Sequence, residues 1–323
     1  MSRSNWKLVF DSFKNLRMLV IGDAMIDAYL WGTINRQSPE APIPIVDIHS
    51  HEQRLGGAAN VAVNLKSLGV TPILCSVVGS EKSEFFDLMN RHGLDSQGVL
   101  TEHRKTTTKT RVIAENKHQL RLDDEDNHPI IKEKAFIENT LALMKEVDAV
   151  IFQDYNKGIL TPTVIETLIS NAKQLKKYIL VDPKKNNFWL YKGAHLFKPN
   201  QNELQEQCDI SINIDNYELL NNTIEKIRKK LDAQHLLLTL SEHGMFIQNN
   251  QCNLLQPAFD RQIIDVSGAG DCVIATAACA LASNLQTKEI ISLSNLAGGL
   301  SCEKVGVNPI EKERLLKEAI RLI

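Results

Sequence analysis

The chain has 323 residues, 43% hydrophobic and 24% charged, which is the composition of a globular protein with a large buried core. A formal net charge of -2, without a long block of Lys and Arg, argues against a protein that binds nucleic acid or a membrane surface. The six cysteines form no Cys-x-x-Cys pair, and no apolar run is long enough for a membrane span or a signal peptide, so we expect a cytoplasmic protein with reduced thiols.

The first predicted elements place two acidic residues at the end of a strand. Residues 5–16 have the spacing of a short amphipathic helix, and residues 17–21 form a buried strand followed by Gly22-Asp-Ala-Met-Ile-Asp27. In open α/β sheets, ligands bind beyond the carboxyl ends of the strands. Asp23 and Asp27 therefore have two interpretations: they hold a polyhydroxylated ligand, or they are turn and capping residues.

Two pairs of β-rich segments predict a small accessory sheet. Tyr29–Thr33 and Ile43–Ile48 have strand character, and the segments 106–114 and 119–123 could pair with them. Together they would form a lid made from residues of about 28–50 and 104–124.

Cationic residues alternate along the second part of this lid, at Lys109, Arg111 and Arg121. They could be solvated strand faces, or they could form a cationic surface for a phosphate group already on the substrate.

A glycine pair precedes the helical spacing between the two lid segments. Gly56 and Gly57 supply backbone amides at the start of this predicted helix, and Gly69 is placed to end it. Asn60 falls in the first turn, where it either caps the helix locally or reaches a ligand hydroxyl.

From residue 70 onwards, strand-like and helix-like segments alternate, which predicts parallel βαβ units and an α/β fold. The predicted strands are 73–78, 149–152, 178–181, 236–240 and a group around 245–255, and the predicted helices are 81–92, 161–177, 201–208 and 216–231. Polar clusters at the strand ends should line one cleft, and they are Gln153–Gly158, Asp182–Lys185, Lys198–Glu203 and Thr239–Gly244.

The segment Asp265-Val-Ser-Gly-Ala-Gly-Asp271 lies directly before a run of small residues with strong helical character. Its glycines predict a tight turn that presents unpaired amides at a helix N-terminus, which is an anion site. An acid at a helix start is commonly a capping residue. Here a phosphate-type cradle lies between Asp265 and Asp271, which favours Asp271 as a general base, since phosphoryl transfer to an alcohol needs a carboxylate near the hydroxyl.

Two of these segments resemble the ribokinase (PfkB-type) carbohydrate kinases, and the resemblance extends over essentially the whole chain. The first is Gly56-Gly-Ala-Ala-Asn60-Val-Ala62, with Gly69 and Gly79 at the family's spacing, and the second is Asp265–Asp271. Thr276 departs from the family pattern, but it falls in a helix interior away from the chemistry. The resemblance implies one domain over residues 1–323: a ribokinase-like three-layer α/β/α sandwich with a mainly parallel central sheet, a small β-sheet lid, and a homodimer formed through the lids.

The resemblance also implies roles for individual residues. Asp271 would be the catalytic base, and the amides of Gly268, Ala269 and Gly270 would form an anion hole. Sugar-contacting positions match Asp27, Gly56, Gly57, Asn60 and Asp154, and candidates for binding the substrate phosphate are Arg36, Lys109, Arg111, Arg121 and Lys157.

The implied cofactors are ATP and Mg²⁺. Asn200 and Glu203 match an Asn-x-x-Glu pair that organises Mg²⁺ and phosphates through water. Thr239, Ser241 and Gly244 match the nucleotide loop, and Asn295 matches a position near the adenosine. Part of the family also has a monovalent-cation site near the position of Asp265, and the sequence leaves this open.

Other segments resemble the family members that phosphorylate D-glycero-β-D-manno-heptose 7-phosphate at O1, in lipopolysaccharide-core biosynthesis. The most specific is Arg36-Gln-Ser-Pro-Glu-Ala-Pro42, followed by Asp154-Tyr-Asn-Lys-Gly158 and Asp182-Pro-Lys184. Some such kinases are fused to an adenylyltransferase, and this chain is expected to be the stand-alone kinase. The alternatives are a sibling kinase of another phosphorylated sugar and a catalytically silent sugar-phosphate sensor.

Overall fold

The computed structural model describes residues 3–81, 83–115, 117–210, 212–214 and 216–323. Within them, a nine-stranded central sheet has the order β13-β12-β11-β10-β9-β8-β1-β4-β5. Strands β11, β10, β9, β8, β1, β4 and β5 of this sheet pair in parallel, whereas β12 and β13 pair antiparallel. Their bounds are β1 Arg17–Gly22, β4 Thr71–Gly79, β5 Val99–Glu102, β8 Ala149–Gln153, β9 Tyr178–Asp182, β10 Leu196–Phe197, β11 His235–Thr239, β12 Met245–Gln248 and β13 Asn253–Gln256.

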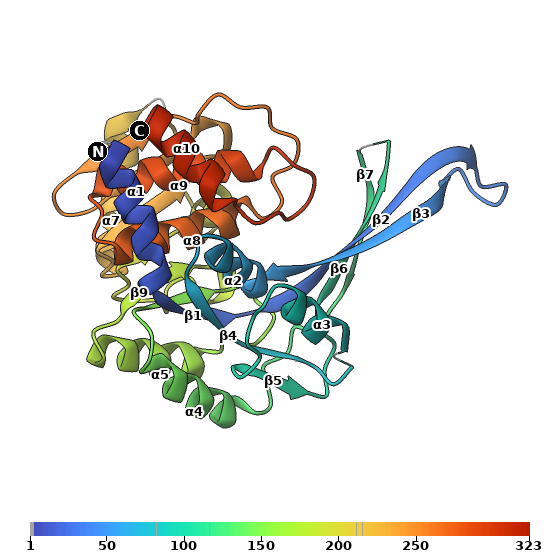
Figure 1. The fold of residues 1–323 in the computed structure, drawn as a ribbon, viewed down its shortest axis with the longest axis horizontal. Coiled ribbons are helices and arrows are strands. Elements are labelled where there is room, and N and C mark those ends of the chain that lie inside the picture. Colours follow the sequence, from blue (N-terminus) through green and yellow to red (C-terminus); the bar gives the residue numbers. More distant parts are fainter. Residues whose placement is uncertain (1–2, 82, 116, 211, 215) are drawn as a thin grey trace.

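Helices cover both faces of this sheet (Figure 1). One face carries α1 (Arg3–Ser12), α2 (Ala58–Ser67), α3 (Ser83–Arg91), α8 (Ala269–Ala282), α9 (Thr287–Ser301) and α10 (Lys312–Leu322). The other carries α4 (Glu133–Met144), α5 (Pro162–Gln174), α6 (Gln201–Cys208) and α7 (Tyr217–Lys230).

The central strands explain why two layers of helices are needed. In β1, Met18 and Val20 pack into one hydrophobic cluster, whereas Leu19 and Ile21 pack into the other. Successive side chains of a strand point to opposite faces, so a strand that is apolar at every position must be covered on both sides. The predicted three-layer α/β fold with a mainly parallel sheet is confirmed.

A second sheet projects from one side of this sandwich (Figure 1). It has the order β3-β2-β6-β7, with β2 at Ala24–Gln37, β3 at Pro44–Gly57, β6 at Thr108–Ala114 and β7 at Lys117–Asp124. β2 pairs antiparallel with β3 and parallel with β6, which joins the two segments predicted to form the small sheet. We call this four-stranded sheet the lid sheet.

The base of the lid sheet adjoins the carboxyl end of the central strands. β2 begins two residues after β1 ends, and Ala24 pairs with Gly57, the residue directly before α2. The lid sheet, the end of β1 and the start of α2 therefore meet at one place, where several predicted site residues lie.

Candidate active site

Asp271 is a buried carboxylate in the first turn of α8 and is held by three side chains from other parts of the chain. Asn60 Nδ2, from α2, donates to Oδ2 at 2.7 Å. Gln153 Nε2, at the end of β8, donates to Oδ1 at 3.0 Å, and the hydroxyl of Tyr155 donates to the same oxygen at 2.9 Å. The three donors fix the orientation of the carboxylate at the carboxyl edge of the sheet.

This environment shifts the acidity of Asp271 towards neutral pH. Burial raises the pKa of Asp271 to about 7, and the neighbouring carboxylate of Asp182 also raises it. The hydrogen bonds from Asn60 and Tyr155 act in the opposite direction, because they stabilise the charged form. A carboxylate whose pKa lies near the working pH can accept a proton during a reaction and release it afterwards.

The turn before Asp271 has the shape expected of an anion site. Gly268 has φ +79°, and a Cβ there would lie 2.9 Å from Val307 Cγ1 and 3.0 Å from Asn60 Nδ2. In the described part of the chain, the amides of Gly268 and Gly270 donate to no carbonyl group, whereas the amide of Ala269 donates to the carbonyl of Val266 at 3.2 Å. Two of the three predicted amides are thus available to a ligand.

Below this turn lies a buried ion pair. Lys198 Nζ lies 3.0 Å from Asp182 Oδ1, and Gln153 Nε2 donates to Asp182 Oδ2 at 3.1 Å. A Cβ on Gly270 would lie only 3.6 Å from Lys198 Nζ, so the turn passes directly over the lysine. The cradle combines open amides with a fixed cation, which suits a phosphate group.

Asn200 and Glu203 form a capping box at the start of α6. Asn200 Oδ1 accepts from the amide of Glu203 at 2.8 Å, and Glu203 Oε2 accepts from the amide of Asn200 at 2.9 Å. The other carboxylate oxygen, Oε1, is ion-paired with Lys184. The pair therefore shapes the helix start and leaves one oxygen of Glu203 to Lys184.

Among the described residues, no three His, Cys, Asp or Glu side chains gather into a metal site. A single carboxylate beside a phosphate cradle instead fits Mg²⁺, which keeps several waters and takes phosphate oxygens as ligands. The assignment of Mg²⁺ to Asn200 and Glu203 stays a prediction from the sequence.

The predicted nucleotide residues lie at the end of β11, in the turn between β11 and β12 and on α9. Thr239 forms a β-bridge with Asn200, and Ser241 (φ +52°) and Gly244 (φ +89°) bound the turn. Asn295 Nδ2 donates to the carbonyls of Gln256 and Pro257, at 3.3 and 2.7 Å. Asn295 thus fixes the end of β13, beside the loop that leads to the anion turn.

Asp23 shapes a loop. Its carboxylate accepts hydrogen bonds from the amides of Tyr155 at 2.8 Å, Lys157 at 3.1 Å and Ile159 at 3.3 Å. Burial raises the pKa of Asp23 to about 6, with a further contribution from Asp154. Of the two interpretations left open for Asp23, the structure shows the turn-forming one, and this loop is the one that presents Tyr155 to Asp271.

Asp154 also has protein partners at both oxygens. They are the amide of Asn156 at 2.8 Å, Asn187 Nδ2 at 2.9 Å and the hydroxyl of Tyr191 at 2.7 Å. Burial raises its pKa even though these donors oppose the shift. A sugar hydroxyl could reach Asp154 only by sharing or replacing one of these partners.

Asp27 lies at the base of the lid sheet, in an ion pair with Arg111. It is buried, and a Cβ on Gly56 would lie 2.2 Å from its Oδ2, so the glycine backbone approaches the carboxylate closely. Arg111 also lies over the ring of Tyr29, 5.6 Å from the centroid. Asp27, Gly56 and Gly57 therefore surround the hinge-like junction between the lid sheet and α2.

The other cations predicted to bind a phosphate also have carboxylate partners. Lys109 lies 3.0 Å from Asp123 and 3.4 Å from Glu125, Arg121 lies 2.8 Å from Asp123, Lys157 lies 2.5 Å from Glu125, and Arg36 lies 4.0 Å from Asp47. Arg36 is far out on the lid hairpin with its side chain 68% exposed. Lys109 shares Glu125 with Lys157 and shares Asp123 with Arg121, so the structure brings these three cations together.

Five residues of the site were not assigned roles from the sequence. They lie in polar clusters that were noted at strand ends: Gln153 and Tyr155 at the end of β8, Asp182 and Lys184 at the end of β9, and Lys198 after β10. The position at a strand end was the available signal. That Tyr155 turns towards Asp271 depends on the path of the 155–159 loop, which Asp23 sets.

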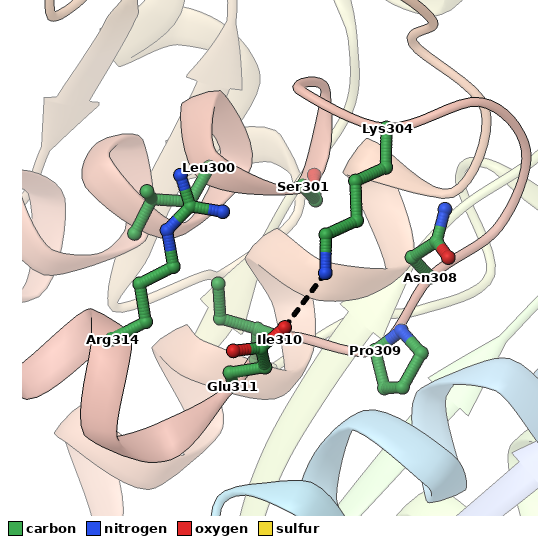
Figure 2. Close-up of a pocket in the computed structure, with 8 residues that line it drawn as sticks. All are labelled: Leu300, Ser301, Lys304, Asn308, Pro309, Ile310, Glu311 and Arg314. Carbon is green, nitrogen blue, oxygen red and sulfur yellow. Dashed lines mark hydrogen bonds and ion pairs between the residues drawn. The ribbon is translucent and has the colours of Figure 1, made fainter.

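Figure 2 shows the residues that line a small cavity at the C-terminal end of α9. This cavity has a volume of about 10 Å³. It is large enough for roughly one water molecule, and the ion pair between Lys304 and Glu311 crosses it. None of the residues that hydrogen-bond with Asp271 lines it, so it is separate from the candidate site. Within the described residues, no helix has both the length and the apolar character needed to cross a membrane.

Comparisons with known proteins show the family to which the chain belongs. The model of the pfkB family of carbohydrate kinases matches residues 15–314. The bifunctional protein HldE of Wolinella succinogenes is 37% identical over 307 residues, covering 93% of this chain and 64% of the relative. HldE of Aliarcobacter butzleri is 38% identical over 298 residues, covering 91% of this chain and 62% of the relative. The chain thus spans just under two thirds of the length of these relatives.

Solved structures show the same fold at low sequence identity. Phosphofructokinase-2 from Escherichia coli superposes with a TM-score of 0.79 at 15% identity, covering 95% of this chain and 99% of that one. Ribokinase from Thermotoga maritima gives a TM-score of 0.71 at 17% identity, covering 95% and 99%. With the family model, the relatives and a buried acid behind a glycine-rich anion turn, the chain belongs to the pfkB family of carbohydrate kinases, phosphotransferases that act on a sugar.

Proposed function

We propose that this kinase transfers the γ-phosphoryl group of ATP to O1 of D-glycero-β-D-manno-heptose 7-phosphate, giving the 1,7-bisphosphate. Support for the phosphotransfer comes mainly from the position of Asp271, a buried carboxylate directly beside open amides at the start of α8. Support for this sugar comes from the resemblance of the segments Arg36–Pro42, Asp154–Gly158 and Asp182–Lys184 to heptose 7-phosphate kinases.

The hydrogen bonds of Asp271 favour one oxygen as the base. Oδ1 accepts from both Gln153 and Tyr155, whereas Oδ2 accepts from Asn60 alone. Because a carboxylate oxygen accepts about two hydrogen bonds, the acceptor hydroxyl binds at Oδ2, on the side of Asn60. Asp271 then takes the hydroxyl proton, O1 forms its bond to phosphorus, and the bond from phosphorus to the leaving ADP oxygen breaks.

The anion turn and Lys198 would stabilise the charge on the transferring group. The amides of Gly268 and Gly270 and the ammonium of Lys198 are fixed before the substrate binds, so they need no reorganisation in the transition state. Bound Mg²⁺ would neutralise phosphate charge beside Asn200 and Glu203. Thr239, Ser241 and Gly244 would line the nucleotide, and Asn295 would set the loop that covers it.

The lid sheet would close over the sugar and contribute to a homodimer. β3 and β7 are its edge strands, and Leu120 and Leu122 on β7 are 55% and 51% exposed. An exposed apolar edge strand is normally covered in a soluble protein. A second copy of the chain on this sheet would cover it, and the group Lys109, Lys157 and Glu125 would face the substrate phosphate.

The test is ADP release from the purified protein with ATP and Mg²⁺, with a panel of acceptors. The panel contains the β- and α-anomers of D-glycero-D-manno-heptose 7-phosphate, sedoheptulose 7-phosphate, fructose 6-phosphate and ribose. Selective turnover of the β-anomer supports the proposal. Turnover of another sugar would keep the kinase mechanism and replace the substrate, and silence on the whole panel with intact ATP binding would favour a sugar-phosphate sensor.

A further inference from the structure

Lys184 lies between the catalytic carboxylate and the residues placed to hold magnesium. It follows β9 by two residues, and its ammonium is ion-paired with Glu203 Oε1. The same ammonium lies 5.6 Å from the centroid of the Tyr155 ring, and the hydroxyl of Tyr155 donates to Asp271 Oδ1 at 2.9 Å. One aromatic ring therefore separates Lys184 from the proposed base.

The two lysines of the site, Lys184 and Lys198, differ in how far their side chains are buried. Lys198 is 3% exposed at its side chain and is fixed by Asp182 at 3.0 Å. Lys184 has a third of its side chain exposed, at 33%, and its ammonium is held by Glu203. A lysine ammonium on a flexible four-carbon stem can exchange one anionic partner for another with little rearrangement of the backbone. Lys184 is the cation of this pair that can move.

Glu203 has only one carboxylate oxygen that could face magnesium or its waters. Its Oε2 accepts from the amide of Asn200 at 2.9 Å in the capping box, so Lys184 occupies the remaining Oε1. If Glu203 organises magnesium and its waters, as the proposed function requires, then Lys184 must share or give up this oxygen. Asp182 and Asp271 also attract this ammonium. The proposed nucleotide site would add the phosphates as a further anionic partner for the released ammonium.

The charges around Lys184 also favour its movement towards the phosphates. Lys198 is ion-paired with Asp182, and Lys184 is ion-paired with Glu203 and is also attracted by Asp182 and Asp271. The three carboxylates outnumber the two lysines, and their repulsion of a triphosphate opposes the attraction of the open amides and Lys198. A cation that turns from Glu203 towards the phosphates removes part of this repulsion at the place where charge develops.

We propose that Lys184 is a phosphate-binding catalytic residue, which Glu203 holds in the nucleotide-free protein and which contacts the transferring phosphoryl group when nucleotide and magnesium are bound. This inference rests on the proposed nucleotide site, but it does not depend on which sugar is the acceptor. A purely structural ion pair would instead keep Lys184 on Glu203 in every state.

The experiment compares calorimetric binding of ADP and of the β,γ-methylene analogue of ATP, both with Mg²⁺ and without any sugar. The proteins are the parent, Lys184→Met, Lys184→Arg and the control Lys185→Met. Lys185 is a matched control, since its side chain is 68% exposed and lies 4.0 Å from Glu206. We expect Lys184→Met to weaken the ATP analogue about 10- to 100-fold more than ADP, the range of a charge-assisted hydrogen bond. Lys184→Arg should restore part of this preference, and Lys185→Met should leave it unchanged.

Retained ADP binding by Lys184→Met shows that the variant is folded. Equal weakening of both nucleotides, or no change in either, would overturn the inference, as would a parent protein that binds neither nucleotide. Since no sugar is present, this outcome is independent of the acceptor panel. If Lys184→Met loses the preference for the ATP analogue and the parent turns over no acceptor of the panel, the role of Lys184 in binding phosphate stands and the proposed substrate is rejected. If the parent turns over the heptose phosphate and Lys184→Met keeps the preference, only the role of Lys184 is rejected.

Discussion

Asn60 and Asp271 are 211 residues apart in the chain, and a hydrogen bond of 2.7 Å joins their side chains in the buried centre of the site. Each belongs to one of the two glycine-rich segments that carry the family resemblance. The contact ties the start of α2 to the start of α8, so that the sugar-side glycines and the anion turn meet at one carboxylate. The proposed acceptor position follows from this bond, because it marks Oδ2 as the oxygen with room for one more donor.

The first prediction concerns the pH dependence of the parent enzyme. Burial raises the pKa of Asp271 to about 7, and the base must be deprotonated to accept a proton. We therefore expect kcat/KM to fall as the pH drops below about 7, approaching tenfold per pH unit, and to level off above it. A steady-state pH profile with saturating ATP measures this limb. A profile that stays flat down to pH 5 would show that a carboxylate of ordinary acidity, or no base, limits the reaction.

The second prediction is a shift of this limb in Asn60→Ala. The amide of Asn60 stabilises the charged form of Asp271, so its removal raises the pKa of the carboxylate further. The acid limb of kcat/KM should move to higher pH, and activity at pH 7 should fall. The measurement is the same profile on the variant. If activity fell with no movement of the limb, Asn60 would act on the sugar alone.

The third prediction uses two glycines of the anion turn as a matched pair. Gly268→Ala forces a side chain onto φ +79° and within 2.9 Å of Val307, so it should lower both stability and activity. Gly270→Ala meets nothing closer than 3.6 Å in the free protein and lies in the first turn of α8. It should keep the thermal stability of the parent but lose activity, because its methyl group fills the phosphate cradle. Full activity of Gly270→Ala would show that the transferring phosphoryl group does not bind in the cradle at Gly270.

The fourth prediction concerns two partly buried histidines at the opposite edge of the sheet, His195 and His235. His195 Nδ1 accepts from the amide of Ile179 at 3.1 Å, and His235 Nε2 faces the amide nitrogen of Asn249 at 3.2 Å. Burial lowers the pKa of both rings. The charges of His235 and Lys173 lower the pKa of His195 further, and the charge of Arg228 lowers that of His235. Protonation would remove the accepting nitrogen in each case.

The sign of the effect follows from the lowered pKa. An unfolded histidine titrates near pH 6.5, so the unfolded state binds more protons below this value and stability is lost as the pH falls through it. Asp23 and Asp271 have raised pKa values and act in the opposite direction, but they are common to the parent and a histidine variant. Between pH 7.5 and 5.5, the parent should therefore lose up to about 1 kcal/mol more unfolding free energy than His235→Gln. Urea unfolding at both pH values measures this difference, and equal losses would contradict it.

The parts of the fold that were predicted are those in which one pattern repeats over several residues. Strand β1 is apolar at successive positions and α8 is a run of small residues, so both were visible in the sequence. The two-residue strand β10 was not predicted, because a pattern of that length carries no periodicity. Helix α4 was also missed, although Phe136 and Met144 are buried in it.

The candidate site shows the same division. The positions of Asn60, Asp271 and the anion turn follow from local glycine chemistry, which the sequence contains. The partners of the predicted phosphate-binding cations do not follow from such a local pattern. Lys109 and Lys157 meet at Glu125, which lies outside the segments in which a cationic surface was expected. The role of Tyr155 was hidden as well, since its direction is set by hydrogen bonds from the 155–159 loop to Asp23, a residue more than a hundred positions away.

The most direct test of the account is the turnover of Asp271→Asn. The substitution keeps the shape of the side chain but removes the proton acceptor, and general-base assistance is worth roughly 10²- to 10⁴-fold. With the acceptor that the parent enzyme turns over, kcat should fall by at least about 100-fold while ATP binding measured by calorimetry is retained. Turnover within a few-fold of the parent would contradict the assignment of Asp271 as the base and, with it, the mechanism proposed for this site.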